Sequence, residues 1–169
     1  PEPTSARSSC DDRRGAASLA IGRAGHVGYG TMMPMDPSIQ DLFEAARAAQ
    51  ERAYSPYSRY PVGAAVRTAS GEIFSGCNVE NAAFPLGTCA EAGALAAMVH
   101  GGARTATEIL VVTNGTTPGT PCGGCRQRIR EFASPETLIH STTVDGNVVT
   151  MTMQQLLPMS FGPEDLEPR

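Results

Sequence analysis

Three cysteines and a glutamate are the residues of this sequence whose types and spacing could do chemistry. Cys122 and Cys125 form a C-x-x-C motif, and Cys89 stands two residues before Glu91. One turn of chain between two thiolates lets both bind a single Zn²⁺ at about 2.3 Å. Three protein ligands with one open position are typical of a catalytic zinc, whereas a structural zinc has four. The spacing therefore predicts a catalytic site with one zinc ion per chain.

The same cysteines allow other arrangements. A redox dithiol of the thioredoxin kind also uses the C-x-x-C spacing. Cys77, at the end of a predicted strand, could be a fourth ligand and close the site into a structural Cys₄ centre. A structural zinc or redox module is therefore the non-enzymatic alternative.

Glu91 has a catalytic and a structural interpretation. A carboxylate beside a zinc site could move protons to and from the reacting atoms. Thr88 and Glu91 also fit a capping box, in which Thr88 is the helix N-cap and Glu91 bonds back to its backbone. The adjacent Cys89 favours the catalytic interpretation.

The elements that position these residues follow from hydrophobic spacing. Asp36 as N-cap, Pro37 after it and apolar residues at helical intervals predict a helix over 37–52. Turn residues at 69–71 and 145–146 indicate two β-hairpins. The full prediction has strands at 62–67, 72–77, 107–113, 137–142 and 148–152, and further helices at 88–100, 122–132 and 154–157. This order predicts an α/β fold with three αβα layers around a five-stranded mixed sheet.

Composition excludes several classes of function. The net charge is -4, and all 13 basic residues are arginine, so neither a Schiff-base lysine nor a P-loop lysine is present. The acidic balance argues against nucleic-acid binding, and the absence of a long apolar run argues against a membrane-spanning segment. Five cysteines cannot all pair within one chain, which favours a reducing compartment and predicts a cytoplasmic protein.

The chain divides into two parts. Residues 1–35 are rich in Ser, Arg, Gly and Ala and show no sustained period, so we expect a poorly ordered N-terminal extension. Residues 36–169 carry the periodic segments and both cysteine groups, and are predicted to form one domain.

Several of these motifs resemble the zinc-dependent cytidine deaminases, in their small homotetrameric branch with three cysteine ligands. The Cys/His-x-Glu and Pro-Cys-x-x-Cys signature is one that zinc deaminases share. The resembling segments are 54–65, 74–84, 88–91, 121–127 and 156–166. Together they span nearly the whole domain.

The resemblance implies a reaction, a cofactor and an assembly. It implies hydrolytic deamination of cytidine and 2′-deoxycytidine to uridine and 2′-deoxyuridine, a step of pyrimidine salvage. Cys89, Cys122 and Cys125 would hold the zinc, and Glu91 would carry a proton from water to N3 of the base and then to the departing amine. The protein would be a homotetramer with active sites shared between chains.

The resemblance also implies contacts with the nucleoside. Asn78 and Glu80 would bond the ribose hydroxyls, Tyr60 and the backbone of Ala90 would contact the base, and Phe161 would stack on the base in a neighbouring subunit. Each side chain has a plainer alternative: Asn78 and Glu80 could cap a loop, Tyr60 could be a core aromatic, and Phe161 could anchor the tail locally.

One position departs from the family pattern. Many relatives with three cysteines have an arginine after the glutamate that bonds to a thiolate sulfur, whereas Ala92 occupies that place here. Arg126, directly after Cys125, could provide this hydrogen bond instead, and the N-termini of the two helices could also relieve the negative charge of the thiolates. The string from Cys89 to Ala92 also occurs in blasticidin S deaminase, so deamination of that cytosine nucleoside antibiotic is the enzymatic alternative.

The remaining residues of chemical interest are given structural roles. Phe84 is expected in the core. His26, His100 and His140 match no zinc motif and are expected at the surface or at helix ends.

Overall fold

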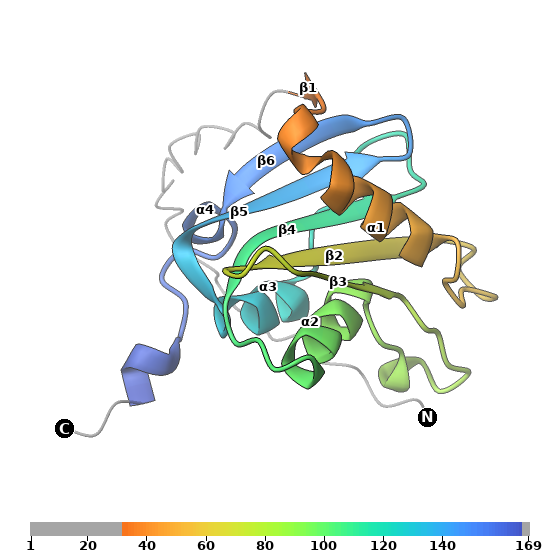
Figure 1. Ribbon diagram of the computed structural model, residues 1–169. Coiled ribbons are helices and arrows are strands. Elements are labelled where there is room, and N and C mark those ends of the chain that lie inside the picture. Colours follow the sequence, from red (N-terminus) through yellow and green to blue (C-terminus); the bar gives the residue numbers. More distant parts are fainter. Residues whose placement is uncertain (1–31, 167–169) are drawn as a thin grey trace, which may run out of the picture.

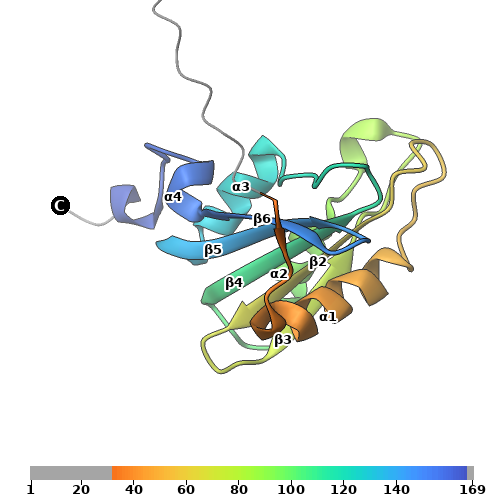
Figure 2. The same cartoon turned by 90° about the horizontal axis from the view of Figure 1, so that it is seen from above.

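The computed structural model describes residues 32–166, which form a mixed sheet of six strands with helices on both faces (Figures 1 and 2). The order across the sheet is β1-β6-β5-β4-β2-β3, and β4 and β5 are its parallel pair. The strands are β1 (Met33–Pro34), β2 (Val62–Thr68), β3 (Ile73–Cys77), β4 (Ala106–Thr113), β5 (Ala133–Thr143) and β6 (Asn147–Thr152). The α-helices are α1 (Gln40–Gln50), α2 (Ala90–His100), α3 (Gly123–Arg130) and α4 (Met153–Leu156).

The sheet contains the five predicted strands and one more. The additional strand, β1, pairs antiparallel with β6, with Met33 opposite Val148. Its two residues lie within the segment predicted as an extension, and a two-residue strand is too short to show an alternating pattern. Residues 1–31 of that segment lie outside the described part of the chain.

The three-layer prediction is confirmed by the two hydrophobic cores. Ala65, Leu110 and Val112 belong to the core under α1, whereas their neighbours Val66 and Val111 belong to the core under α2. Successive residues of a strand point to opposite faces, so each central strand supplies both cores. Figure 2 shows α1 on one side of the sheet and α3 on the other.

Two glycines let the helices approach the sheet closely. A Cβ atom at Gly63 would lie 1.9 Å from the carbonyl oxygen of Ala46 in α1. A Cβ atom at Gly76 would lie 2.4 Å from the backbone nitrogen of Ala94 in α2. The backbone of α2 is therefore in direct contact with the backbone of β3, and this contact fixes the position of the residues at the start of α2.

The first helical segment begins as predicted. The Asp36 side chain accepts a hydrogen bond of 2.8 Å from the backbone N–H of Ser38, and a 3₁₀ turn (Pro37–Ile39) leads into α1. None of the helices between residues 32 and 166 combines the length and apolar character needed to cross a membrane.

Candidate active site

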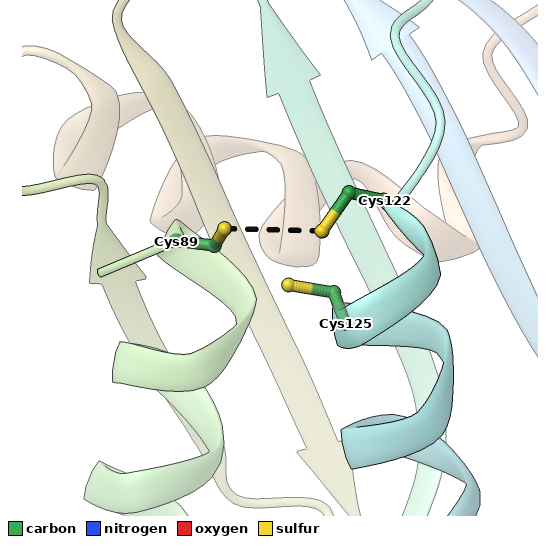
Figure 3. A group of neighbouring side chains, drawn as sticks. All are labelled: Cys89, Cys122 and Cys125. Atoms are coloured by element: carbon green, nitrogen blue, oxygen red, sulfur yellow. Dashed lines mark hydrogen bonds between the residues drawn. The ribbon is translucent and has the colours of Figure 1, made fainter. Parts of the chain in front are cut away.

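The three predicted zinc ligands meet at the starts of two helices (Figure 3). The Sγ atoms of Cys89, Cys122 and Cys125 all lie within 4.8 Å of one another, and those of Cys89 and Cys122 are 4.0 Å apart. Two ligands at about 2.3 Å from a tetrahedral zinc are about 3.8 Å apart. The three sulfurs are therefore spaced to share one zinc ion.

The backbone places these sulfurs at two helix N-termini. Cys89 is the N-cap residue of α2, and its carbonyl oxygen accepts a bond of 3.2 Å from the Gly93 N–H. Cys122 is the N-cap residue of α3, and its carbonyl oxygen accepts a bond of 2.9 Å from the Arg126 N–H. Cys125 follows in the first turn of α3. Both helices direct their positive ends toward the sulfurs, which stabilises thiolates.

The electrostatics of the three thiols suit a cation. Burial raises the pKa of Cys89 and Cys125, and the Glu91 carboxylate raises both further. The backbone N–H of Cys125 is the main cause that lowers the pKa of Cys122. A metal ion reverses the unfavourable shifts, because a coordinated thiol is deprotonated outright. The donor set therefore fits zinc, whose usual soft ligand is a cysteine thiolate.

Cys77 is not part of the cluster. Its thiol donates to the carbonyl oxygen of Arg52 at 3.6 Å, and the group of potential metal ligands found within residues 32–166 holds only the other three cysteines. The Cys₄ alternative is wrong, because the end of β3 directs this side chain toward the chain that follows α1.

Glu91 is buried beside the sulfurs. Only 5% of its surface is exposed, and it lines the same cavity as Cys89 and Cys122. The capping-box alternative is wrong: the helix N-cap is Cys89 and has no side-chain cap, because the helix begins one residue later than the box requires. A buried carboxylate at this place is available for proton transfer.

The cavity in front of the sulfurs has a volume of about 390 Å³. This volume falls in the usual range for small-molecule sites. The cavity brings together most of the predicted site residues: Tyr60, Asn78, Glu80, Cys89, Ala90, Glu91 and Cys122. Cys125 is fully buried and is not among the lining residues.

Several lining residues were not singled out from the sequence. Thr113 lies at the end of β4, and Gly119 and Thr120 lie in the loop before Cys122. The Gly119 N–H donates to Thr113 Oγ1 at 3.1 Å, which ties this loop to the strand. These residues could have been identified from the sequence, because their loop lies between a predicted buried strand and the C-x-x-C motif.

Asn78 and Glu80 brace the loop at 54–61 while lining the cavity. The Asn78 amide accepts from the Val62 N–H at 2.8 Å and donates to the Tyr60 carbonyl oxygen at 3.0 Å. The Glu80 carboxylate accepts from the Tyr57 N–H at 2.8 Å. Hydrogen bonds from Ser58 and then Tyr57 lower its pKa, so Glu80 is ionised at neutral pH. The loop-capping contacts are thus present, and both residues also line the cavity.

The aromatic residues at the cavity are exposed. Tyr60 lines the wall and is 39% exposed, so it is not a core aromatic. Phe84, expected in the core, is 76% exposed and lines the cavity. That expectation was wrong because a 3₁₀ turn (Phe84–Leu86) projects from the fold, where the Phe84 ring meets Tyr57 edge-on at a centroid distance of 6.0 Å.

Arg126 does not contact a sulfur. Its guanidinium donates to the carbonyl oxygens of Pro121 and Leu156, both at 2.9 Å, and to Thr120 Oγ1 at 3.2 Å. The expected hydrogen bond to a thiolate is therefore absent among the hydrogen bonds of the described residues. Arg126 instead ties the loop before Cys122 to the end of α4.

Phe161 lies outside the cavity of its own chain. Its side chain is 59% exposed, and it is not among the lining residues. Its carbonyl oxygen accepts from the Gln127 side chain of α3 at 2.9 Å. The described chain thus holds this residue by its backbone and leaves the ring at the surface.

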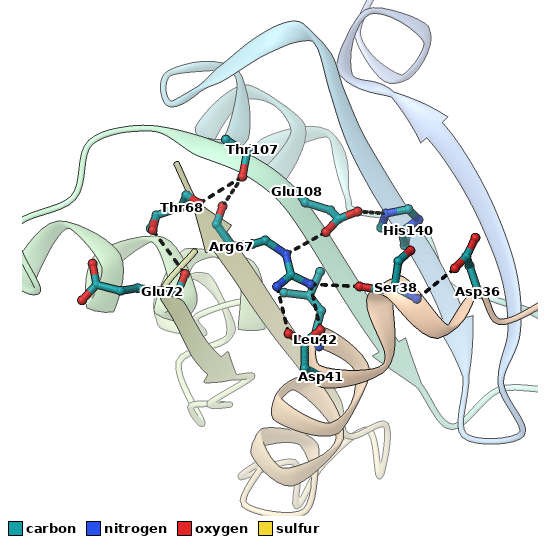
Figure 4. Close-up of polar contacts among 10 residues, drawn as sticks. All are labelled: Asp36, Ser38, Asp41, Leu42, Arg67, Thr68, Glu72, Thr107, Glu108 and His140. Carbon is teal, nitrogen blue, oxygen red and sulfur yellow. Dashed lines mark hydrogen bonds and ion pairs between the residues drawn. The ribbon is translucent and has the colours of Figure 1, made fainter. Parts of the chain in front are cut away.

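One histidine is placed differently from the prediction (Figure 4). His140 is 4% exposed within β5, where its ring bonds to Thr150 Oγ1 at 2.8 Å and to Glu108 at 3.1 Å. The surface prediction was wrong because partners on two neighbouring strands satisfy the ring. His100 is exposed at the end of α2 as expected, and His26 lies outside the described residues.

Comparisons with known proteins agree with this site. The profile of a family described as "Cytidine and deoxycytidylate deaminase zinc-binding region" matches residues 37–141. The cytidine deaminase of Sporosarcina psychrophila is 39% identical over 128 residues, which cover 76% of this chain and 94% of that protein. The cytidine deaminase of Halalkalibacterium halodurans is 39% identical over 127 residues, which cover 75% of this chain and 96% of that protein.

A solved structure is also similar. The crystal structure of cytidine deaminase from Burkholderia pseudomallei matches with a TM-score of 0.69 and 43% identity, covering 72% of this chain and 97% of that one. The family match includes all three clustered cysteines and Glu91.

Proposed function

Because the chain belongs to the cytidine and deoxycytidylate deaminase zinc-binding family, we propose that the cavity described above binds the nucleoside with its base facing Glu91. The chain is an enzyme that deaminates cytidine, and it uses one zinc ion per chain. The non-enzymatic module is thereby excluded. The cytosine antibiotic alternative receives no support, since the relatives described above are cytidine deaminases.

Each residue of the centre has a proposed role. Cys89, Cys122 and Cys125 would hold the zinc, which supplies a water molecule whose pKa is lowered to about 7. Glu91 would accept a proton from this water and deliver it to N3 of the base. The hydroxide left from the water would form a bond to C4 of the base. The carboxyl group would then take the second proton, from the new C4 hydroxyl, and give it to the amine, so that the C4–N bond breaks, ammonia leaves and the oxygen stays on the ring as a carbonyl.

The nucleoside would be held by the walls of the cavity. Asn78 and Glu80 would bond the ribose hydroxyls, and Tyr60 and the Ala90 backbone would contact the base. The support is that all four line the cavity. Because Asn78 and Glu80 are already oriented by the loop that they brace, they would lose little freedom on binding the sugar. We propose 2′-deoxycytidine as a second substrate.

The site would be completed by a neighbouring chain in a homotetramer. Phe161 is exposed and does not line the cavity of its own chain, and an exposed aromatic on a polar tail is suited to covering another surface. Stacking of its ring on the base of a neighbour would give a closed, symmetric assembly. We propose the cytoplasm as the location, because zinc binding needs reduced thiols.

The sulfur cluster beside buried Glu91 is the observation that carries this function. The test follows the cytidine absorbance band after addition of zinc-loaded protein, with blasticidin S as a parallel substrate. We expect the band to disappear with cytidine and with 2′-deoxycytidine, and to persist after zinc is chelated. Turnover of blasticidin S but not of cytidine would contradict the proposal.

A further inference from the structure

Helix α3 holds the segment that follows α4. Arg126 binds the Leu156 carbonyl oxygen at 2.9 Å, and Gln127 binds the Phe161 carbonyl oxygen at 2.9 Å. Arg130 donates from Nε to Ser160 Oγ at 3.0 Å. These contacts link α3 to the last residue of α4 and to the segment 157–166, which leaves the sheet beyond α4 (Figure 1).

The contact around Arg130 is tightly built. The Arg130 side chain is mostly buried and forms an ion pair with the Glu164 carboxylate. Gly162 is buried against it, and a Cβ atom there would lie 2.5 Å from Arg130 Nη2. The Gly162 N–H is taken by the Asp165 carboxylate at 2.7 Å. The backbone on both sides of Phe161 is thus fastened by polar contacts.

The Phe161 ring takes no part in this contact. Its neighbours Ser160 and Gly162 face α3, whereas the ring is among the exposed large hydrophobic groups. A hydrophobic anchor would show the opposite arrangement, with a buried ring and a loose backbone. The alternative in which the Phe161 ring anchors the tail within its own chain is therefore not supported by this geometry.

We infer that Arg130 and Gln127 are positioning residues that hold the backbone around Phe161 so that its ring reaches the cavity of a second copy of this chain. This inference rests on the proposed shared site. It adds a second role for α3, whose N-cap and first turn hold Cys122 and Cys125: the same helix also orients the Phe161 ring that its chain contributes to the active site of a neighbour. We call the contacts of Arg130 and Gln127 with the segment 160–164 the clamp. An ordered segment loses less conformational freedom when it docks on a neighbour, so the clamp strengthens binding of the nucleoside.

The test compares Arg130→Met with Phe161→Ala in the zinc-loaded, assembled enzyme. We expect Arg130→Met to raise the KM for cytidine about 10-fold, as when charge-assisted hydrogen bonds are removed, with kcat, zinc content and oligomeric state little changed. In the Phe161→Ala background the same substitution should change KM by less than about 2-fold, because the residue acts through the ring.

Two further variants keep the test decisive if Arg130→Met folds poorly. Glu164→Gln removes the ion pair from the exposed side, and Gly162→Ala displaces the Arg130 guanidinium without removing a hydrogen-bonding group. Both should raise KM in the same direction. The matched control is Arg47→Met, which breaks an exposed ion pair between Arg47 of α1 and the C-cap residue Glu51 and should leave KM unchanged.

The outcomes distinguish failure of the positioning role of Arg130 and Gln127 from failure of the proposed shared active site. If Phe161→Ala raises KM but the clamp variants do not, the positioning role is refuted and the shared site stands. Equal effects of Arg130→Met with and without the Phe161 ring would refute positioning through that ring. If Phe161→Ala leaves KM unchanged, both the shared site and the positioning role are wrong.

Discussion

The Sγ atoms of Cys89 and Cys122 lie 4.0 Å apart although 33 positions separate the two residues in sequence. A disulfide would need about 2.05 Å, whereas two thiolates on one zinc are about 3.8 Å apart. The folded chain thus presents these sulfurs at a metal-binding distance.

The first prediction concerns this centre. Cys122→Ala removes one of three sulfurs, so zinc content should fall from about one equivalent per chain to near zero, and deaminase activity should be lost with it. Metal analysis of the purified protein measures this. Cys77→Ser is the control, because Cys77 lies outside the cluster, and it should retain its zinc. Full zinc in Cys122→Ala would contradict the assignment.

The second prediction concerns Glu91. Glu91→Gln keeps the shape of the side chain but cannot accept a proton, so kcat should fall by at least about 10²–10⁴-fold. Zinc content and thermal stability should change little, since Glu91 makes no capping bond at the start of α2. A variant that loses stability while keeping its turnover would point to a structural role.

The third prediction concerns Arg126. Because its guanidinium ties Pro121, Thr120 and Leu156 together, Arg126→Gln should loosen the loop before Cys122. Zinc retention against a chelator, or turnover, should fall on the order of 10–100-fold. Ala92→Arg should not compensate, because the Arg126 guanidinium bonds to backbone and hydroxyl oxygens rather than to a sulfur. Full rescue by Ala92→Arg would show that Arg126 acts on a thiolate after all.

The fourth prediction tests whether active sites are shared. Glu91→Gln alone should be nearly inactive, because it cannot transfer the proton. Phe161→Asp alone should lose roughly 5- to 150-fold in kcat/KM, since stacking on a base contributes roughly 1–3 kcal/mol and a carboxylate removes it. After joint unfolding and reassembly with zinc, mixed assemblies would contain sites with both an intact Glu91 and a neighbour's intact Phe161. Activity should reappear. If Phe161 acts within its own chain, mixing restores nothing.

The fifth prediction concerns pH and His140. Burial lowers the pKa of this histidine below its usual 6.5, and the opposing bond to Glu108 does not offset it. The unfolded chain therefore binds the proton more readily than the folded one. The stability contributed by the neutral ring is complete above about pH 6.5 and declines as the pH falls toward the lower, folded-state pKa.

The measurement is the free energy of unfolding between pH 8 and pH 5 for the parent and for His140→Gln. A glutamine can bond to Thr150 and Glu108 without titrating, so its stability should fall less steeply below about pH 6.5. Loss of zinc at low pH affects both proteins alike, and the difference isolates the histidine. The Asp41 carboxyl, whose pKa Arg67 lowers to about 2, titrates below this window. Parallel curves for the two proteins would contradict the prediction.

Features encoded by neighbouring residues could be read from the sequence. The spacing of Cys122 and Cys125 predicted two ligands on one helical turn, and the period of the segment after Pro37 predicted α1. Both hairpins followed from their turn residues. Such patterns depend on interactions between residues a few positions apart in sequence, so these elements can be predicted without knowledge of the fold. The family motifs extended them to the reaction and its metal.

The tertiary structure decided what depends on residues distant in sequence. Glu91 fits a capping box by spacing, yet its helix begins at Ala90 with Cys89 as the N-cap and packs so that the carboxylate is buried beside the sulfurs. His140 is polar and isolated in sequence, and it is buried because Glu108 and Thr150 reach it from adjacent strands. Arg126 bonds to loop and helix oxygens that only the fold brings near. Burial and long-range hydrogen bonds are properties of packing, and no local pattern specifies them.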